Sequence, residues 1–167
     1  DAKQTAGQFD ACILVAEDNP VNQAIAVGML EHLGCRTAVA GNGCEAIQSL
    51  KQSAYDLILM DCQMPEMDGY EATRMIRQQE QYAGGNAGES SSHDRRIPII
   101  ALTANALEGS REVCLAASMD DYLAKPFAPP ELLHAVAPCA EPHRLLQENP
   151  PFRKKAYATY HLEQTIG

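Results

Sequence analysis

Side chains that could hold a cation or a phosphoryl group stand at the ends of several apolar segments of the sequence. Each of them ends or directly follows such a segment: Glu17, Asp18, Asp61, Thr103 and Lys125. Carboxylates are the ligands that Mg²⁺ prefers, and a lysine or a hydroxyl can hold phosphoryl oxygens. If these side chains lie together, they would suit phosphoryl transfer to an aspartate. Their position depends on the elements that carry them.

The apolar segments have the length and composition of β-strands. The five segments are short: residues 12–16, 36–40, 56–61, 97–103 and 121–124. The first, third and fourth are the most apolar of them. The third segment shows no alternation of apolar and polar residues, which is typical of a strand whose two faces are both covered. The sequence therefore predicts a sheet that is buried on both sides.

Polar residues and prolines mark the helices between these strands. Four helices have recognisable start signals: Asn19 before Pro20, Asn42 before Glu45, Asp68 before Glu71, and Pro129 with Pro130. Gly34 is placed to end the first helix. A further helix is predicted over residues 106–118. The last helix is predicted over residues 129–137, where Pro138 would end it.

Strands and helices alternate five times over residues 11–137. This order predicts an α/β fold, namely a doubly wound parallel sheet with helices on both faces and right-handed crossovers. In such open sheets, ligands bind beyond the carboxyl ends of the strands. The polar side chains named above follow those ends, so we expect them to converge at one edge of the sheet.

Three carboxylates at one edge would repel one another. Two unit charges ~4 Å apart interact by ~4 kcal/mol at an effective dielectric constant of ~20. One lysine cannot neutralise three carboxylates, whereas a divalent cation relieves the repulsion, and oxygen ligands suit Mg²⁺. Lys125 and Thr103 could then hold phosphoryl oxygens while Asp61 acts as the nucleophile.

Four motifs of the sequence resemble those of a known family: ILVAEDNPVNQ, LILMDCQMPEMDGYEATRMIR, IPIIALTANAL and MDDYLAKPF. Their content and order resemble the receiver domain of two-component response regulators, and most of all the receivers of hybrid sensor histidine kinases. The resemblance covers about residues 11–137. It implies a flavodoxin-like, five-stranded parallel sheet with the strand order 2-1-3-4-5.

The resemblance also implies a role for each polar side chain. Asp61 would be the phosphoacceptor. Mg²⁺ or Mn²⁺ would be held by Glu17 (through water), Asp18, Asp61 and the backbone carbonyl of Gln63. Thr103 and Tyr122 would change position on phosphorylation. Lys125 would hold the phosphoryl group, and its bond to Pro126 would be cis.

Gln63 and Asn105 stand at the positions that the family uses to tune hydrolysis of the acyl phosphate. Both are amides that could orient a water molecule, so we expect moderate autodephosphorylation. The chain would then catalyse its own phosphorylation and dephosphorylation without turning over a separate substrate.

The sequence departs from the family's pattern in two places, and both leave the motifs intact. The Gly- and Ser-rich residues 83–96 are predicted to be a flexible insertion. Ser118 stands where a glycine is common. Residues 1–10 are predicted to be a polar linker, and residues 138–167 a linker or tail.

Three other functions are compatible with part of this pattern. An aspartyl-phosphate phosphatase of the haloacid dehalogenase type would carry a second acid two residues after Asp61, where this chain has Gln63. A flavodoxin would bind a phosphate at its first loop, where Glu17 and Asp18 would repel it. A degenerate receiver that serves only as a protein-binding module is the alternative, but such receivers typically lack one of the key residues.

Composition argues against several kinds of partner. The net charge of −9 is unfavourable for nucleic acid, which needs clustered cations. No apolar run approaches the ~20 residues that span a bilayer. The six cysteines have no metal-binding spacing, so we expect reduced thiols in a cytosolic protein.

The phosphoryl group is expected to come from another domain or protein. No histidine has the acid- and lysine-flanked helical context of a phosphodonor: His32, His93, His134, His143 and His161. The expected partners are a histidine kinase core or another phosphohistidine donor, and a histidine phosphotransfer domain as onward acceptor. We expect no nucleic acid, no direct membrane contact and no effector. The location would be cytoplasmic, either free-standing or as the cytoplasmic part of a membrane-bound sensor kinase.

Overall fold

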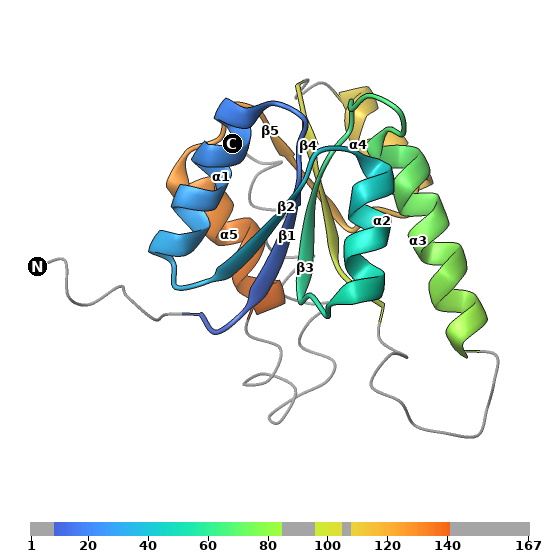
Figure 1. The fold of residues 1–167 in the computed structure, drawn as a ribbon. Coiled ribbons are helices and arrows are strands. Elements are labelled where there is room, and N and C mark those ends of the chain that lie inside the picture. Colours follow the sequence, from blue (N-terminus) through green and yellow to red (C-terminus); the bar gives the residue numbers. More distant parts are fainter. Residues whose placement is uncertain (1–8, 85–95, 105–107, 141–167) are drawn as a thin grey trace, which may run out of the picture.

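The computed structural model describes residues 9–84, 96–104 and 108–140 of the chain. Within these residues, strands and helices alternate as the sequence predicts (Figure 1). Their bounds are β1 (Cys12–Ala16), α1 (Pro20–His32), β2 (Arg36–Ala40), α2 (Gly43–Gln52), β3 (Leu57–Asp61), α3 (Gly69–Gly84), β4 (Ile99–Thr103), α4 (Glu108–Ala116), β5 (Asp121–Ala124) and α5 (Pro129–Ala140).

The strands lie parallel in one sheet, in the order β2-β1-β3-β4-β5. This confirms the predicted fold class and strand order. From β1 the chain moves outward to β2, and from β3 it moves outward to β4 and β5, so the winding reverses between β1 and β3. In doubly wound sheets, ligands bind at such a switch point. The ends of β1 and β3 are therefore where a site is expected.

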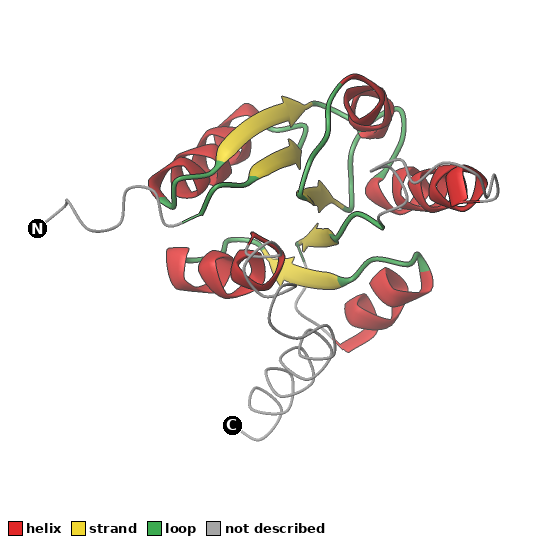
Figure 2. Ribbon diagram, turned by 90° about the horizontal axis from the view of Figure 1, so that it is seen from below, coloured by secondary structure: helices red, strands yellow, loops and turns green. Residues whose placement is uncertain are grey.

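Each face of the sheet has its own apolar core, because side chains alternate along a strand. From β1, Ile13 and Val15 pack with α1 and α5, whereas Leu14 and Ala16 pack with α2, α3 and α4. The two helical layers therefore cover opposite faces (Figure 1). Figure 2 shows the sheet between them from below. Burial on both sides makes the central strands a rigid base for the residues at their ends.

Local signals in the sequence set the two ends of α1. The side chain of Asn19 caps the helix by accepting a hydrogen bond from the N–H of Val21 (2.9 Å), and Pro20 opens the first turn. At the other end, Gly34 has a φ of 90°, and its N–H donates to the carbonyl of Glu31 (3.0 Å). The left-handed glycine ends the helix as predicted.

The turn from α4 into β5 has the same geometry without a glycine. Ser118 has a φ of 70°, in the left-handed region that favours glycine. Its N–H donates to the carbonyl of Leu115 (3.0 Å), and the N–H of Met119 donates to that of Cys114 (3.0 Å). These two bonds form a Schellman motif. A serine therefore occupies a conformation for which glycine is the usual residue.

The predicted end of α5 was wrong. The helix continues through Pro138 to Ala140 instead of ending at residue 137. Pro138 cannot donate a hydrogen bond within the helix. However, Leu132, Val136 and Cys139 lie on one helical face and are buried in the core beneath it. Of these side chains, only Cys139 lies beyond Pro138, so its burial on this face favours continuing the helix past the proline.

Several other element ends differ slightly from the prediction. α3 extends to Gly84, two residues into the predicted insertion 83–96, and residues 85–95 lie outside the described residues. β4 begins after Pro98, which has no N–H to offer a neighbouring strand. In the described ranges, no helix is both long and apolar enough to cross a membrane.

A buried arginine of α3, Arg77, joins this helix to the starts of β4 and β5. Its guanidinium donates to Glu80 (3.0 Å), Asp120 (2.7 Å), and the carbonyls of Ile97 (2.7 Å) and Ser118 (3.0 Å). The side chain of Arg77 is 8% exposed, whereas that of Arg96, which also pairs with Asp120, is 57% exposed. A single buried guanidinium therefore joins two acidic side chains and two backbone carbonyls.

Replacing Arg77 with methionine should strongly destabilise the protein, because Glu80 and Asp120 lose their buried partner. We expect the free energy of unfolding to fall by about 3–5 kcal/mol. The matched change Arg96→Met removes an exposed pair and should cost less than about 1 kcal/mol. Urea denaturation of both variants measures the difference, and equal losses would contradict this role of Arg77.

Candidate functional site

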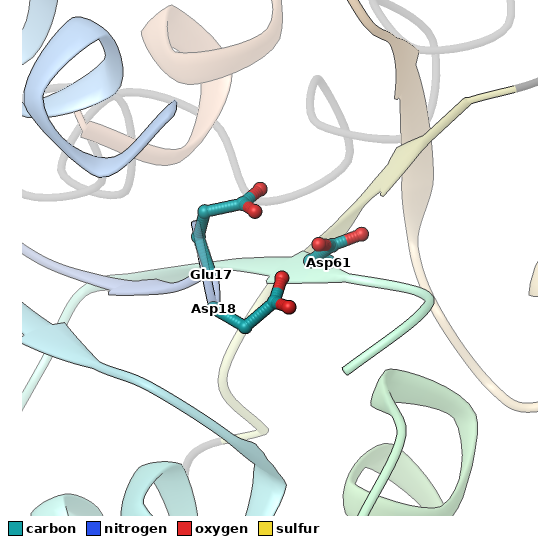
Figure 3. A group of neighbouring side chains, drawn as sticks. All are labelled: Glu17, Asp18 and Asp61. Atoms are coloured by element: carbon teal, nitrogen blue, oxygen red, sulfur yellow. The ribbon is translucent and has the colours of Figure 1, made fainter. Parts of the chain in front are cut away.

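Three carboxylates meet at the carboxyl ends of β1 and β3. One oxygen each from Glu17, Asp18 and Asp61 lies within 4.8 Å of the others, and Figure 3 shows the three groups gathered at one place. The register explains this arrangement, because Ala16 of β1 pairs with Met60 of β3. Glu17 and Asp61, the residues after this pair, are therefore neighbours at the switch point.

Glu17 is almost completely buried, with 1% of its surface exposed. Its Oε1 accepts hydrogen bonds from the N–H of Asn19 (3.2 Å) and the side chain of Asn22 (3.5 Å). Its Oε2 accepts from the ammonium of Lys125 (3.2 Å). A buried carboxylate with donors on both oxygens is held in a fixed orientation.

Lys125 reaches two of the carboxylates from the other side of the pocket. Its Nζ lies 3.2 Å from Oδ2 of Asp61 and 3.2 Å from Oε2 of Glu17. The backbone N–H of Lys125 donates to the carbonyl of Thr103 (2.7 Å), which continues the pairing of β4 with β5. The bond from Lys125 to Pro126 is cis, as the resemblance implied.

The pKa of Asp61 is raised from 3.8 to about 6. Burial is the largest cause, and the charge of Glu17 is the next. The ammonium of Lys125 and the N–H of Gln63, which donates to Oδ1 (3.3 Å), act in the opposite direction without cancelling the rise. The metal-free site is therefore unfavourable for a charged Asp61.

The pKa of Lys125 is also raised. Burial lowers it, but the charges of Asp61 and Glu17 outweigh burial. Lys125 is therefore charged at neutral pH, and one positive charge faces three carboxylates. The donor set and this excess of negative charge fit a hard divalent cation, whose ligands are oxygens.

Most of the predicted site residues line one pocket. The structure brings together Glu17, Asp18, Asp61, Gln63, Thr103 and Lys125. Tyr122 is not among the pocket residues, and it packs half-buried against the core beneath α2, α3 and α4. Asn105 lies outside the described residues. The predicted roles of these residues remain predictions, because geometry alone does not test them.

The pocket also contains residues that were not predicted to lie in it. Asn19, Asn22, Cys62 and Tyr70 line its wall. Gln23 stabilises the end of β1 by donating from Nε2 to the carbonyl of Glu17 (2.5 Å). The sequence contained a signal for Asn22 and Gln23. They are amides in the first turn of the helix that follows Glu17 and Asp18, and this short separation places them close to the two acids.

The loop that follows Asp61, residues 62–68, folds back closely over the end of β3. The N–H of Gly69 donates to the carbonyl of Cys62 (3.2 Å). A methyl group at Gly69 would overlap the backbone carbonyl oxygen of Asp61, so only glycine permits this approach. The loop therefore holds Gln63 beside the carboxylate of Asp61.

The raised pKa of Asp61 predicts a pH-dependent gain in stability for Asp61→Asn without metal. The folded protein binds the Asp61 proton more tightly than the unfolded chain, so the stability of the wild type falls as pH rises from about 4 to about 6. The asparagine side chain of the variant does not titrate. The free energy of unfolding of Asp61→Asn, relative to that of the wild type, should therefore rise by up to about 3 kcal/mol between pH 4 and pH 7.5.

Urea denaturation at the two pH values, in the presence of a chelator, measures this difference in the free energy of unfolding. Comparing the difference at pH 7.5 with that at pH 4 cancels any effect of the substitution that is unrelated to charge. A difference that is the same at both pH values, or that shrinks as pH rises, would contradict the proposed cost of charging Asp61.

The sequence and the fold both match known proteins. The family model of the response regulator receiver domain matches residues 13–137. Hybrid signal transduction histidine kinase B of Dictyostelium discoideum is 46% identical over 121 residues, which are 72% of this chain and 6% of that kinase. The match spans 14% of probable histidine kinase 1 of Oryza sativa subsp. indica and 14% of histidine kinase 5 of Arabidopsis thaliana.

The solved structures that share the fold include two receiver domains. The receiver domain of the sensor histidine kinase PA1611 from Pseudomonas aeruginosa, solved with magnesium coordinated in its active-site cleft, is 46% identical with a TM-score of 0.65. The match covers 78% of this chain and 98% of that one. The receiver of Saccharomyces cerevisiae Ssk1, in complex with the histidine phosphotransfer protein Ypd1, is 30% identical with a TM-score of 0.75, over 84% and 96% of the two chains. The chain therefore belongs to the response regulator receiver domain family of two-component phosphorelays.

Proposed function

We propose that this receiver takes a phosphoryl group from a phosphohistidine onto Asp61 in a reaction that needs Mg²⁺. The observation that carries the proposal is the position of Lys125, whose ammonium lies 3.2 Å from Asp61 and 3.2 Å from Glu17. A cation beside the nucleophile can hold an oxygen of the incoming phosphoryl group. This arrangement positions the nucleophile and the charge-stabilising group together.

In the proposed step, a carboxylate oxygen of Asp61 attacks phosphorus. The new P–O bond forms as the P–N bond to the donor imidazole breaks, and its electron pair stays on the imidazole nitrogen. Lys125 and the hydroxyl of Thr103 hold phosphoryl oxygens. Mg²⁺, bound by Glu17 through water and by Asp18, Asp61 and the backbone carbonyl of Gln63, would supply the remaining positive charge.

The side chains around the pocket suggest how phosphorylation is read and reversed. Thr103 lies in the pocket, and Tyr122 on the neighbouring strand β5 packs against the core that α4 shares. We propose that both shift on phosphorylation and alter the surface of β4, β5 and α4. The exposed amide of Gln63, together with Asn105, would orient water for hydrolysis of the acyl phosphate.

The donor and the onward acceptor are proposed to be histidine-bearing partners. Related receivers belong to hybrid histidine kinases, and a structural neighbour was solved with a histidine phosphotransfer protein. We therefore propose a kinase core as donor and a histidine phosphotransfer domain as acceptor, in the cytoplasm and most simply within a hybrid kinase. Residues 11–137 would form the receiver, which α5 extends to 140, with linkers on either side.

The exposed apolar side of α1 is the proposed docking surface for the histidine phosphotransfer domain. Val21 and Ile25, one helical turn apart, are 66% and 48% exposed. Ile25 and Met29 line an apolar groove that continues along the helix. Asn22 of the same helix lines the phosphoacceptor pocket, so the apolar surface adjoins that pocket. A partner that packs on this surface can place its histidine next to Asp61.

Asp61→Asn should abolish Mg²⁺-dependent labelling by acetyl phosphate, because the amide is not a nucleophile. The matched variant Asp10→Asn alters an exposed aspartate outside the pocket and should label like the wild type. Intact-protein mass spectrometry measures the labelled fraction. Labelling of Asp61→Asn at the wild-type level would refute the site, and absence of labelling in the wild type would favour a receiver that serves only as a binding module.

Ile25→Glu should slow phosphoryl exchange with a phosphorylated histidine phosphotransfer domain by about tenfold or more, because a charge would be buried at the contact. Labelling by acetyl phosphate, which needs no docking, should be unchanged. Val113→Glu on α4 is the matched control, because both side chains are 48% exposed. Quenched time courses of phosphoryl transfer measure the rate for each variant. Equal effects of the two substitutions would contradict docking on α1.

A further inference from the structure

We propose that Asn42, the cap of α2, is a positioning residue for the loop that binds the metal. The β3–α3 loop comprises residues 62–68, and it carries the backbone carbonyl of Gln63. The inference rests on the proposed function, because it concerns how that carbonyl is held. It extends the site to a helix that contributes no residue to the pocket itself.

The β3–α3 loop contains a strained turn. Glu66 has a φ of 68°, which is uncommon for a residue with a side chain. The N–H of Met67 donates to the carbonyl of Pro65 (2.7 Å), so the turn is closed by a bond between residues two apart. Three-residue turns with a positive φ at the centre are rare and strained. Such a conformation persists only where its surroundings hold it.

Two neighbouring residues at the start of α2 hold this turn. Asn42 donates from Nδ2 to Oε2 of Glu66 (3.2 Å), and the N–H of Gly43 donates to the carbonyl of Met67 (3.0 Å). A methyl group at Gly43 would clash with Met67 and with Ala72, so the helix start and the loop are in close contact. The loop is thus held at its tip by α2.

Both the oxygen and the nitrogen of the Asn42 side-chain amide make a hydrogen bond. Asn42 is 9% exposed, and its Oδ1 accepts a hydrogen bond from the N–H of Glu45 (2.9 Å), which is the helix cap. Aspartate caps helices as well as asparagine does. The cap alone therefore does not require the amide, whereas the bond to Glu66 requires a donor that aspartate lacks.

The position of Gln63 connects this contact to the metal site. Gln63 lies between Asp61, whose Oδ1 accepts its N–H, and the turn at Glu66. Gly69 packs against Asp61 at the base of the loop, and Asn42 holds its tip. Releasing the tip lets the segment with the metal-binding carbonyl change its orientation. Groups that orient metal ligands commonly alter metal affinity by 10–100-fold when they are lost.

The test is a set of variants whose Mg²⁺ dissociation constants are measured by calorimetric titration at physiological ionic strength. Asn42→Asp keeps the cap but sets two carboxylates against each other, and it should weaken Mg²⁺ binding by about tenfold. Glu66→Gln keeps an acceptor for Asn42 and should bind Mg²⁺ within about twofold of the wild type, because an exposed charge outside the pocket is screened. The double variant N42D/E66Q reverses the direction of the bond and should restore affinity to the same range.

A second comparison leaves the cap of α2 untouched. Glu66→Ala and Glu66→Gln remove the same charge, but only Glu66→Ala removes the bond to Asn42, so only Glu66→Ala should bind Mg²⁺ more weakly. This pair decides the question if Asn42→Asp fails to fold. Wild-type affinity in Glu66→Ala, or a double variant as weak as Asn42→Asp, would overturn the positioning role.

The same Mg²⁺ titrations distinguish failure of the proposed function from failure of this inference. If Asp61→Asn binds Mg²⁺ as tightly as the wild type, the metal site itself is wrong. If Asp61→Asn loses Mg²⁺ while Asn42→Asp and Glu66→Ala retain wild-type affinity, the site stands and Asn42 has no positioning role.

Discussion

The repulsion among three carboxylates, opposed by a single lysine, is the interaction on which this receiver depends. Glu17 and Asp61 are buried, Asp18 lies beside them, and Lys125 contacts the first two. The pKa of Asp61 is raised to about 6 because burial and Glu17 disfavour its charge. Such a site is unfavourable when empty. It gains most from binding a divalent cation and a phosphoryl group, which the proposed reaction requires.

The rest of the fold serves to keep these charges together. Strands covered on both faces hold Glu17 and Asp61 at the same level, because Ala16 pairs with Met60. The pairing of β4 with β5 places Lys125 beyond Thr103. The loop after β3 is held at its base through Gly69 and at its tip through α2. If these elements were flexible, mutual repulsion would move the carboxylates apart.

Much of this could be predicted from the sequence, because the signals were local or periodic. Apolar runs gave the strands, caps such as Asn19 gave helix starts, and strand ends gave the site residues. The path of α5 through Pro138 was missed because burial of its apolar face outweighs the local signal. The contact between Asn42 and Glu66 was also missed, since 24 residues separate them and only the folded chain brings them together.

Chemical trapping of the acyl phosphate tests the central claim most directly. The protein is incubated with Mg²⁺ and a phosphorylated histidine phosphotransfer domain, treated with borohydride, and mapped by peptide mass spectrometry. Reduction converts an aspartyl phosphate to homoserine, so the modified position is read from the mass. The account predicts homoserine at residue 61 with Mg²⁺ and none when Mg²⁺ is chelated. Homoserine at another aspartate, or none with Mg²⁺ present, would contradict it.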